Sequence, residues 1–371
     1  MPHDPYKALY VHVPFCVSRC GYCDFETQAV PCDDPRIGGY IRDISAQIRE
    51  KEQEGELSEI ASVYVGGGTP THIGGKQLSA LLNALAESVD AEHGDIEFTI
   101  EANPESFDGE IASLARSSGV NRISIGVQSF DDTMLQFLGR AHDAEKAREA
   151  IRIAKRVFPN VSIDLMCGIP GQTDEVLASS IAEAVELHVE HVSVYSLSIE
   201  PHTPFYKAVM KGYMDEPDED VQAHQLELAR DLLASEGYAR YEVANYAHPG
   251  YESKHNSSYW TGVPYLGLGL GATTMTQNAE RRMRVCNGQV VDDLDARQMA
   301  AEDMMLGMRM ASGISDELVK HAENLIGGVE EAFEALSADG LAIHEGGRWK
   351  PTDLGWLCGN ELYGRILDLA P

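Results

Sequence analysis

The chain has 371 residues, and 29 Lys and Arg against 59 Asp and Glu give it a formal net charge of −30. This balance argues against nucleic acid or an anionic membrane surface as a partner, because both would repel an acidic protein. The hydrophobic share of 43% supports a substantial core in one large domain plus a small one. No apolar run is long enough to span a bilayer, and the first residues lack the pattern of a signal peptide. We therefore expect a cytoplasmic protein whose 7 cysteines stay reduced.

Strand-like and helix-like segments alternate from residue 8 to about residue 200. The expected strands are Leu9–Val13, Ser62–Val65, Glu97–Glu101, Arg122–Gln128, Ser162–Met166 and His191–Leu197. The amphipathic runs between them are Tyr40–Glu54, Lys76–Asp90, Gly109–Ser117, Ala144–Val157 and Val176–His188. This order predicts an α/β fold with parallel strands joined by right-handed crossovers.

The pattern changes beyond residue 212, where an acidic, proline-containing stretch leads into a predicted helix at Val221–Ser235. From residue 295 the sequence predicts three helices and then a hairpin. These helices are Arg297–Met310, Asp316–Ala322 and Val329–Ala338, and the hairpin covers 340–349. We expect three units: a main domain over 1–212, a connecting segment over 213–294, and a small winged-helix-like α+β domain over 295–371.

Three cysteines follow the first predicted strand closely, at Cys16, Cys20 and Cys23. Zinc sites usually show a second cysteine pair or histidines at fixed spacing, and neither follows here. Iron–sulfur clusters normally take four thiolates, so a site with three leaves one iron open to another ligand. The alternative is a reduced cysteine-rich turn with structural zinc or no metal. The other four cysteines are scattered, and we expect them to be small buried or incidental residues.

The spacing Cys-x-x-x-Cys-x-x-Cys, with Tyr22 before the third cysteine, resembles the signature of radical S-adenosylmethionine proteins. The longer string Tyr10-Val-His-Val-Pro-Phe-Cys16 is similar to the branch that holds oxygen-independent coproporphyrinogen III oxidases and HemW-type haem chaperones. The resemblance implies a [4Fe-4S] cluster on the three cysteines and S-adenosylmethionine on its open iron. It also implies a partial (β/α)6 TIM-like barrel, whose site would lie at the C-terminal ends of the strands.

Polar residues near the ends of the predicted strands suggest a ligand pocket. A glycine triplet at 66–68 lets the backbone approach a ligand, although alone it fits a plain tight turn. Glu101 ends the third strand, where the alternative is a pair with a nearby Arg. Asp164 interrupts an apolar strand and needs a partner, and a salt bridge to Arg140 is the structural alternative. By resemblance, the cofactor pocket comprises Tyr10, Gly67, Gly68, Thr69, Glu101, Gln128, Arg140, Asp164 and Ser196.

The string His255-Asn-Ser-Ser-Tyr-Trp260 resembles the corresponding motif of the HemW-type chaperones. Histidine is a common axial ligand of haem iron, and aromatic rings offer a flat apolar surface to a porphyrin. The alternative is an ordinary packing histidine. No fourth cysteine follows Cys23, which also favours the chaperones. Thr273 and Thr274 stand in a motif where relatives tend to carry a histidine, so the contact made there stays open.

These observations predict a radical S-adenosylmethionine-type protein that binds haem through His255 and hands it to an acceptor protein. The resemblance also implies a low-potential electron donor such as a flavodoxin or ferredoxin. The alternative is an enzyme that oxidatively decarboxylates the propionate side chains of coproporphyrinogen III. Tight haem binding without that conversion would separate the two functions.

Overall fold

A computed structural model describes residues 3–89 and 96–371 of the chain. Its largest part is a 12-stranded sheet whose centre is built from six parallel strands in the order in which they occur in the chain. These strands are β1 (Ala8–Val13), β4 (Ser62–Gly67), β5 (Glu97–Ala102), β6 (Arg122–Gln128), β7 (Asn160–Cys167) and β8 (His191–Ser196). The predicted strands and their parallel pairing are confirmed, with ends that differ by at most two residues.

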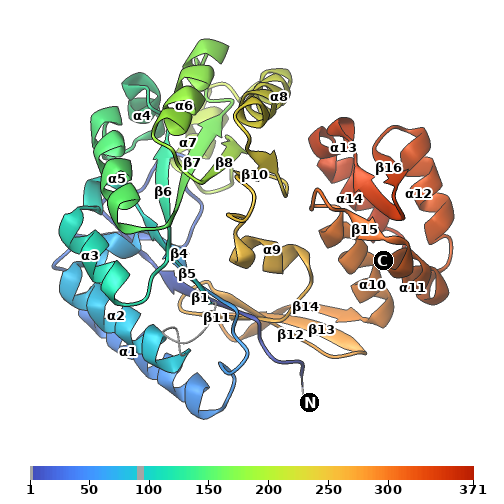
Figure 1. Cartoon of the computed structure of the whole chain (residues 1–371), viewed down its shortest axis with the longest axis horizontal. Coiled ribbons are helices and arrows are strands. Elements are labelled where there is room, and N and C mark those ends of the chain that lie inside the picture. The colour runs from blue at the N-terminus through green and yellow to red at the C-terminus, as the bar shows by residue number, and fades with distance from the viewer. Residues whose placement is uncertain (1–2, 90–95) are drawn as a thin grey trace.

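Helices cover the outer face of this sheet and carry the chain from one parallel strand to the next (Figure 1). They are α1 (Pro35–Gln53), α2 (Gly75–Ser88), α3 (Gly109–Ser117), α4 (Asp132–Leu138), α5 (Ala144–Val157) and α6 (Asp174–Glu186). Helix α1 begins five residues earlier than predicted, because Pro35 suits a first turn and the Asp34 carboxylate caps it. The short α4 was missed, and the predicted end at Asp90 lies outside the described residues.

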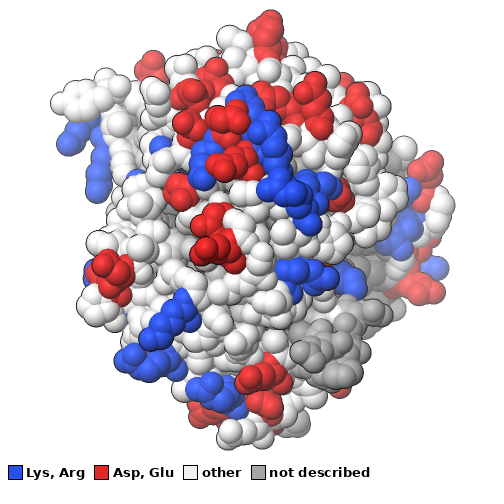
Figure 2. Space-filling view, turned by 60° about the vertical axis from the view of Figure 1, so that its left-hand side comes forward, with Lys and Arg blue, Asp and Glu red and all other residues white. Residues whose placement is uncertain are grey.

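The main core lies between the sheet and these helices. Val63 and Val65 of β4 and Ile123 and Ile125 of β6 are fully buried and belong to it. Because side chains alternate along a strand, the residues between them face the inside of the curved sheet. This arrangement makes a partial (β/α)6 barrel, as predicted. Figure 2 shows acidic and basic side chains interspersed over one face, which is consistent with a solvated charged surface.

The segment 213–294 adds strands to both edges of the same sheet. After α7 (Pro204–Met210) and α8 (Glu219–Ser235), β10 (Asn245–Ala247) pairs with β8, and β9 (Ala239–Arg240) pairs with β10. Beyond α9 (Lys254–Trp260), β11 (Tyr265–Leu268) runs parallel to β1 at the other edge. The remaining strands form an antiparallel ribbon of β12 (Thr273–Gln277), β13 (Arg281–Cys286) and β14 (Gln289–Asp295). The segment 213–294, which we expected to be a connection between domains, therefore extends the barrel sheet at both edges. Within it, the Thr274 hydroxyl forms hydrogen bonds with the backbone N–H and carbonyl of Gly267.

The C-terminal part has a core of its own and a three-stranded antiparallel sheet. Its elements are α10 (Ala296–Gly307), β15 (Ile314–Ser315), α11 (Asp316–Ile326), α12 (Val329–Ala338), β16 (Ala342–Glu345), β17 (Arg348–Pro351), α13 (Asp353–Leu357) and α14 (Gly359–Leu367). The succession helix, strand, two helices and hairpin is winged-helix-like, as predicted. No helix within the described ranges is long and apolar enough to cross a membrane.

A buried arginine ties the antiparallel ribbon to the C-terminal part. Arg282 on β13 has a side chain that is only 1% exposed, and it donates to Glu302 (2.5 Å) and Asp303 (2.6 Å) on α10. Close by, the Arg309 guanidinium lies 5.0 Å from the ring of Trp260, at the end of α9. Charge and aromatic contacts therefore join the two parts of the chain.

Replacing Arg282 with Met should destabilise the protein by about 3–5 kcal/mol, because Asp303 loses its counter-charge and Glu302 keeps only its pair with Arg284. Urea unfolding followed by circular dichroism measures this loss. The neighbouring Arg281→Met removes an exposed pair with Asp293 and should leave the unfolding midpoint nearly unchanged. Equal midpoints for both variants would contradict a structural role for Arg282.

Candidate functional site

A cavity of about 370 Å³ opens at the C-terminal ends of the parallel strands. Side chains of β4, β5, β6, β7 and β8 line it, together with the cysteine-containing loop. Its lining includes these predicted residues: Cys16, Cys20, Cys23, Gly67, Gly68, Glu101, Gln128, Arg140, Asp164 and Ser196. The fold thus brings together most of the residues that the sequence assigned to one pocket.

The cysteine loop is held at both ends and in its middle. Two short strands, β2 (Phe15–Cys16) and β3 (Gln28–Ala29), pair in parallel and close it. Within the loop, the Gly21 N–H donates to the Leu138 carbonyl (3.0 Å), and the Gly21 carbonyl accepts from the Phe205 N–H (2.9 Å). A Cβ at Gly21 would lie 2.1 Å from the Phe205 ring, so only glycine fits there. The three thiols therefore occupy defined positions at the mouth of the cavity.

Burial favours the protonated form of the thiols, whereas two nearby hydrogen-bond donors and a bound cationic centre would favour the thiolate form. Burial raises the pKa of Cys16 to about 11 and also raises the pKa of Cys23. The Thr69 hydroxyl donates to Cys16 Sγ (3.3 Å), and Arg140 donates to Cys20 Sγ (3.4 Å). Across the described residues, no trio of His, Cys, Asp or Glu side chains is gathered tightly enough for a single metal ion. Three thiols around one cavity, with donors aimed at two of them, fit the thiolate set of a larger iron–sulfur group.

The glycine triplet joins the end of β4 to the start of the cysteine loop. A Cβ at Gly67, whose φ is +105°, would lie 2.3 Å from the His12 ring, and one at Gly68 would lie 2.7 Å from the Val13 carbonyl oxygen. The Gly68 N–H donates to Val13 (2.8 Å). The Gly67 N–H donates to Glu101 (3.0 Å), so this amide points at a protein carboxylate. The glycines thus allow the end of β4 to pack closely against the cysteine loop, and the approach of this backbone to a ligand stays a prediction.

Glu101 lies at the end of β5 with both carboxylate oxygens engaged. Oε1 accepts from the Tyr64 hydroxyl (2.7 Å), and Oε2 accepts from the Gly67 N–H (3.0 Å). Burial raises the pKa of Glu101 to about 7, with a further increase from nearby Asp164, although both hydrogen bonds oppose the rise. No ion pair to Arg is present at Glu101 within the described residues. This carboxyl group can therefore change its charge near neutral pH inside the cavity.

Arg140 and Asp164 do not form the salt bridge considered from the sequence. Arg140 donates to the Asn103 side chain (2.6 Å), to the Gly126 carbonyl (2.7 Å) and to Cys20. Asp164 instead accepts from the Ser124 hydroxyl (3.4 Å), and burial raises its pKa. Both side chains line the cavity and face its interior.

Gln128 and Ser196 also line the cavity, at the ends of β6 and β8. Gln128 adopts a left-handed backbone (φ 68°) at a register shift in β6. Backbone strain of this kind in non-glycine residues clusters at functional sites.

Two predicted pocket residues, Tyr10 and Thr69, lie beside the cavity and do not line it. The Tyr10 hydroxyl bonds His12 Nδ1 (2.9 Å), and the Tyr10 ring stacks against Tyr64. Thr69 is 1% exposed, and its hydroxyl accepts from the Asn103 side chain (2.7 Å). Both residues support groups that do reach the cavity.

His255, the predicted haem ligand, is buried in the barrel interior and is only 1% exposed. Its Nδ1 bonds the Ser62 hydroxyl (3.0 Å), and its Nε2 bonds the Tyr259 hydroxyl (3.1 Å). The ring stacks on Tyr64 with 5.0 Å between centroids, and burial lowers the pKa of His255 to about 3. This arrangement does not support ligation of haem iron by His255, because the ring is buried and both of its nitrogens are engaged in hydrogen bonds.

Several residues that line the cavity were missed from the sequence. They are Tyr64, Asn103, Arg122, Ser124, Ser193, Tyr195 and Asn256. Arg122, Ser124, Gly126 and Gln128 occupy alternate positions of β6, whose other residues are apolar. The missed signal was therefore a period-two polar pattern within a strand otherwise assigned as core.

Comparison with known proteins identifies the class. The family model of the radical SAM superfamily matches residues 10–184, and that of the HemN C-terminal domain matches residues 294–358. The structure of the Escherichia coli radical SAM enzyme coproporphyrinogen III oxidase (HemN) superposes with a TM-score of 0.78. The superposition covers 100% of this chain and 90% of that one at 21% identity, which supports a shared fold. The chain is a radical S-adenosylmethionine protein.

The relatives define the family more narrowly. The chain is 35% identical to the "Heme chaperone HemW" of Lactococcus lactis, over 97% of both chains. It is 32% identical to the Bacillus subtilis protein of the same name, over 97% of this chain and 99% of that one. The chain therefore belongs to the HemW family, whose members include the Escherichia coli protein, 36% identical over 72% of this chain and 70% of that one. Membership of the superfamily implies a [4Fe-4S] cluster and S-adenosylmethionine.

Replacing Cys20 with Ala should abolish most of the charge-transfer absorbance of anaerobically reconstituted protein, because one thiolate of the cluster is lost. Iron and sulfide content per chain measures the effect. Cys32→Ala is the matched control, since this exposed cysteine lies outside the cavity. A full complement of iron and sulfide in Cys20→Ala would show that the cluster lies elsewhere.

Replacing Glu101 with Gln should change the pH dependence of stability. The folded-state pKa of about 7 lies above the usual 4.5, so folding favours the protonated carboxyl group. Its contribution is present below pH 4.5 and is lost as the pH rises through 7. Glu101→Gln should remove this decline, which is on the order of 1–3 kcal/mol. Urea unfolding at pH 5 and pH 8, without cofactor, measures the difference.

Glu105→Gln is the control, because the pKa of Glu105 is shifted in the direction opposite to that of Glu101. Burial raises the pKa of Glu105, but the bond to His142 and the charge of Arg140 outweigh burial and lower it overall. The stability that this group contributes is present above pH 4.5 and lost as the pH falls. The Glu105 variant should therefore lose stability at pH 8, where the Glu101 variant gains it. The same direction of change in both variants would contradict the electrostatics described here.

Proposed function

We propose that this protein is a haem chaperone that holds a [4Fe-4S] cluster and S-adenosylmethionine in its barrel and transfers haem to an acceptor protein. The observation that carries the proposal is similarity over 97% of both chains to a protein named as a haem chaperone. The acceptor is a protein partner, and a low-potential flavodoxin or ferredoxin is the expected electron donor. A cytoplasmic location is part of the same proposal.

The cavity offers groups suited to each part of the cofactor. Cys16, Cys20 and Cys23 would hold the cluster, which supplies an open iron and one electron for cleavage of the cofactor's sulfonium. Glu101 would accept hydrogen bonds from the amino group or the ribose of S-adenosylmethionine, because its carboxylate lines the cavity and is buried. Asp164 and the strained Gln128 offer further polar atoms to the nucleoside. The fixed guanidinium of Arg140 holds positive charge beside Cys20.

The alternative function, decarboxylation of coproporphyrinogen III, draws on the same barrel architecture. The solved HemN structure shares the fold at 21% identity, and that similarity does not carry its substrate over to this chain. The two proposals differ in what happens to the tetrapyrrole. A chaperone retains haem tightly, whereas a decarboxylase converts coproporphyrinogen III to protoporphyrinogen IX.

One anaerobic experiment tests the choice. Reconstituted protein should bind haem at about one equivalent in a titration followed at the Soret band. The same protein, incubated with coproporphyrinogen III, S-adenosylmethionine and a strong reductant, should yield no protoporphyrinogen IX by chromatography. The HemN enzyme named above is the positive control for conversion. Conversion by this protein, without stoichiometric haem binding, would replace the chaperone by the decarboxylase.

A further inference from the structure

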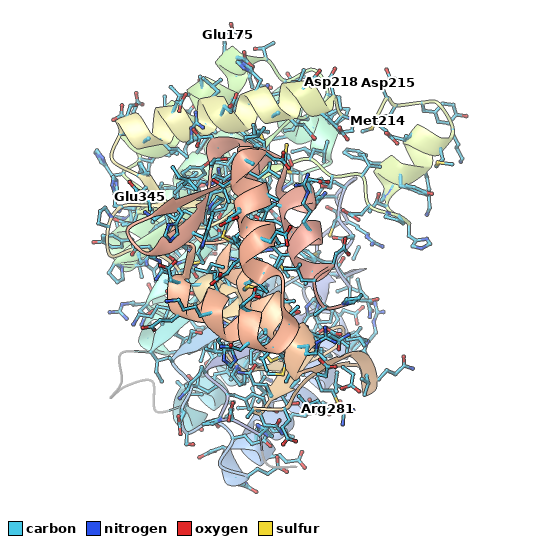
Figure 3. All side chains as sticks on the ribbon, turned by 90° about the vertical axis from the view of Figure 1, so that its right-hand side faces the viewer. Glu175, Met214, Asp215, Asp218, Arg281 and Glu345 are labelled. Carbon is cyan, nitrogen blue, oxygen red and sulfur yellow. The ribbon has the colours of Figure 1, made fainter. Side chains whose placement is uncertain are left out.

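The arm that follows β8 stands beside the cysteine loop. Residues 197–218 contain α7 and leave the barrel at its C-terminal edge, and Figure 3 shows Met214 and Asp215 on this arm as it projects from the body. Its base is anchored by Phe205, whose N–H donates to the Gly21 carbonyl (2.9 Å). The Phe205 ring also packs against Phe137, with 5.2 Å between centroids. A group bound on this arm would therefore lie close to the loop that carries the three cysteines.

Helix α7 presents apolar side chains to solvent. None of its residues is buried. Met210 is 68% exposed and Tyr213 is 81% exposed, the two highest values among the exposed large hydrophobic residues of the described chain. Tyr206 precedes Met210 by four positions, which places the two side chains on one face of the helix. Apolar side chains grouped on one exposed helix face offer a surface to which another molecule can bind.

An available imidazole stands directly before this helix. Three exposed histidines, His188, His202 and His321, have no side-chain hydrogen bond within the part of the chain that the structure describes. Of these, only His202 belongs to the arm. Its backbone is left-handed (φ 69°), and the next residue, Thr203, caps α7.

The charge on α7 complements an acidic ligand. Lys207 and Lys211 are both exposed and lie one turn apart on or directly after the helix, in a chain with a net charge of −30. Haem combines an iron that takes an imidazole ligand, a wide apolar ring system and two propionate groups. His202, the face of Tyr206 and Met210, and the two lysines offer one partner to each of these features.

The geometry points to the α7 arm as the haem site of this protein, with His202 as the iron ligand. This inference rests on the proposed chaperone function and assigns to it a site other than His255. The porphyrin would lie against Tyr206 and Met210, and its propionates would meet Lys207 and Lys211. Haem held there would remain accessible to an acceptor protein, which suits transfer.

The test is an anaerobic titration of the reconstituted full-length protein with haem. His202→Ala should weaken binding by roughly tenfold or more and shift the Soret band. Added imidazole should restore the spectrum by replacing the lost ligand. His188→Ala is the matched control, because the His188 side chain is also exposed and without a hydrogen bond among the described residues, and its backbone is also left-handed (φ 55°). Both variants should keep the wild-type cluster content and melting temperature.

A second pair of measurements tests the lysines. Lys207→Glu combined with Lys211→Glu should weaken haem binding, but should not affect binding of the haem dimethyl ester, whose propionates carry no charge. Tight binding of haem by the wild type that survives His202→Ala unchanged would overturn this site and leave the proposed function standing. Failure of the wild type to bind haem at all would overturn the proposed function itself.

Discussion

The functional end of the barrel depends on the close approach of β4 to the start of the cysteine loop. The Gly68 N–H bonds the Val13 carbonyl (2.8 Å), and the Thr69 N–H bonds the Phe15 carbonyl (2.7 Å). A Cβ at Gly67 or Gly68 would collide with His12 or with the loop backbone. This junction brings the Thr69 hydroxyl to Cys16 and the Gly67 amide to Glu101. These two backbone hydrogen bonds therefore help to position Cys16, a predicted cluster ligand, and the Glu101 carboxylate.

The hydrogen-bond partners of the charged groups in the cavity are mostly neutral donors and acceptors and not groups of opposite charge. Glu101 is bonded by a tyrosine hydroxyl and an amide, and Asp164 is bonded by a serine hydroxyl. Arg140 is bonded by an amide oxygen and a carbonyl oxygen, so it keeps its charge beside Cys20. Burial raises the pKa values of both carboxyl groups, although these hydrogen bonds oppose the rise. A cationic ligand would lower them again, which couples its binding to proton release.

The sequence predicted the parts of the molecule that obey local periodicity. The bounds of β6 and of α3 and α5 agree with the structure, because their apolar residues follow the periods of a strand and a helix. The cysteine spacing likewise predicted the loop at the mouth of the cavity. The ribbon β12–β14 was missed, since its strands are polar and carry no alternating apolar face. Short, exposed strands of this kind are recognised only through their pairing.

The position of His255 could not have been predicted locally. The Glu97 carboxylate on β5 accepts the His255 N–H (2.9 Å) across 158 positions of the chain, and this bond seats the start of α9 within the barrel. The sequence motif of a histidine followed by aromatic residues is the same whether the histidine is exposed to solvent or buried against a residue such as Ser62. Only the long-range contact distinguishes a packing residue from a ligand, and here it favours packing. His202 carried no sequence signal beyond being one of several histidines outside the barrel strands.

The central claim is that three thiols in this cavity hold a cluster with one open iron, beside residues that bind S-adenosylmethionine. Electron paramagnetic resonance of the dithionite-reduced, reconstituted protein tests it most directly, with spectra recorded before and after addition of S-adenosylmethionine. The account predicts a signal from a reduced [4Fe-4S] cluster whose g values shift when the cofactor is added. An unchanged signal at saturating cofactor, or no such signal in protein with full iron content, would contradict it.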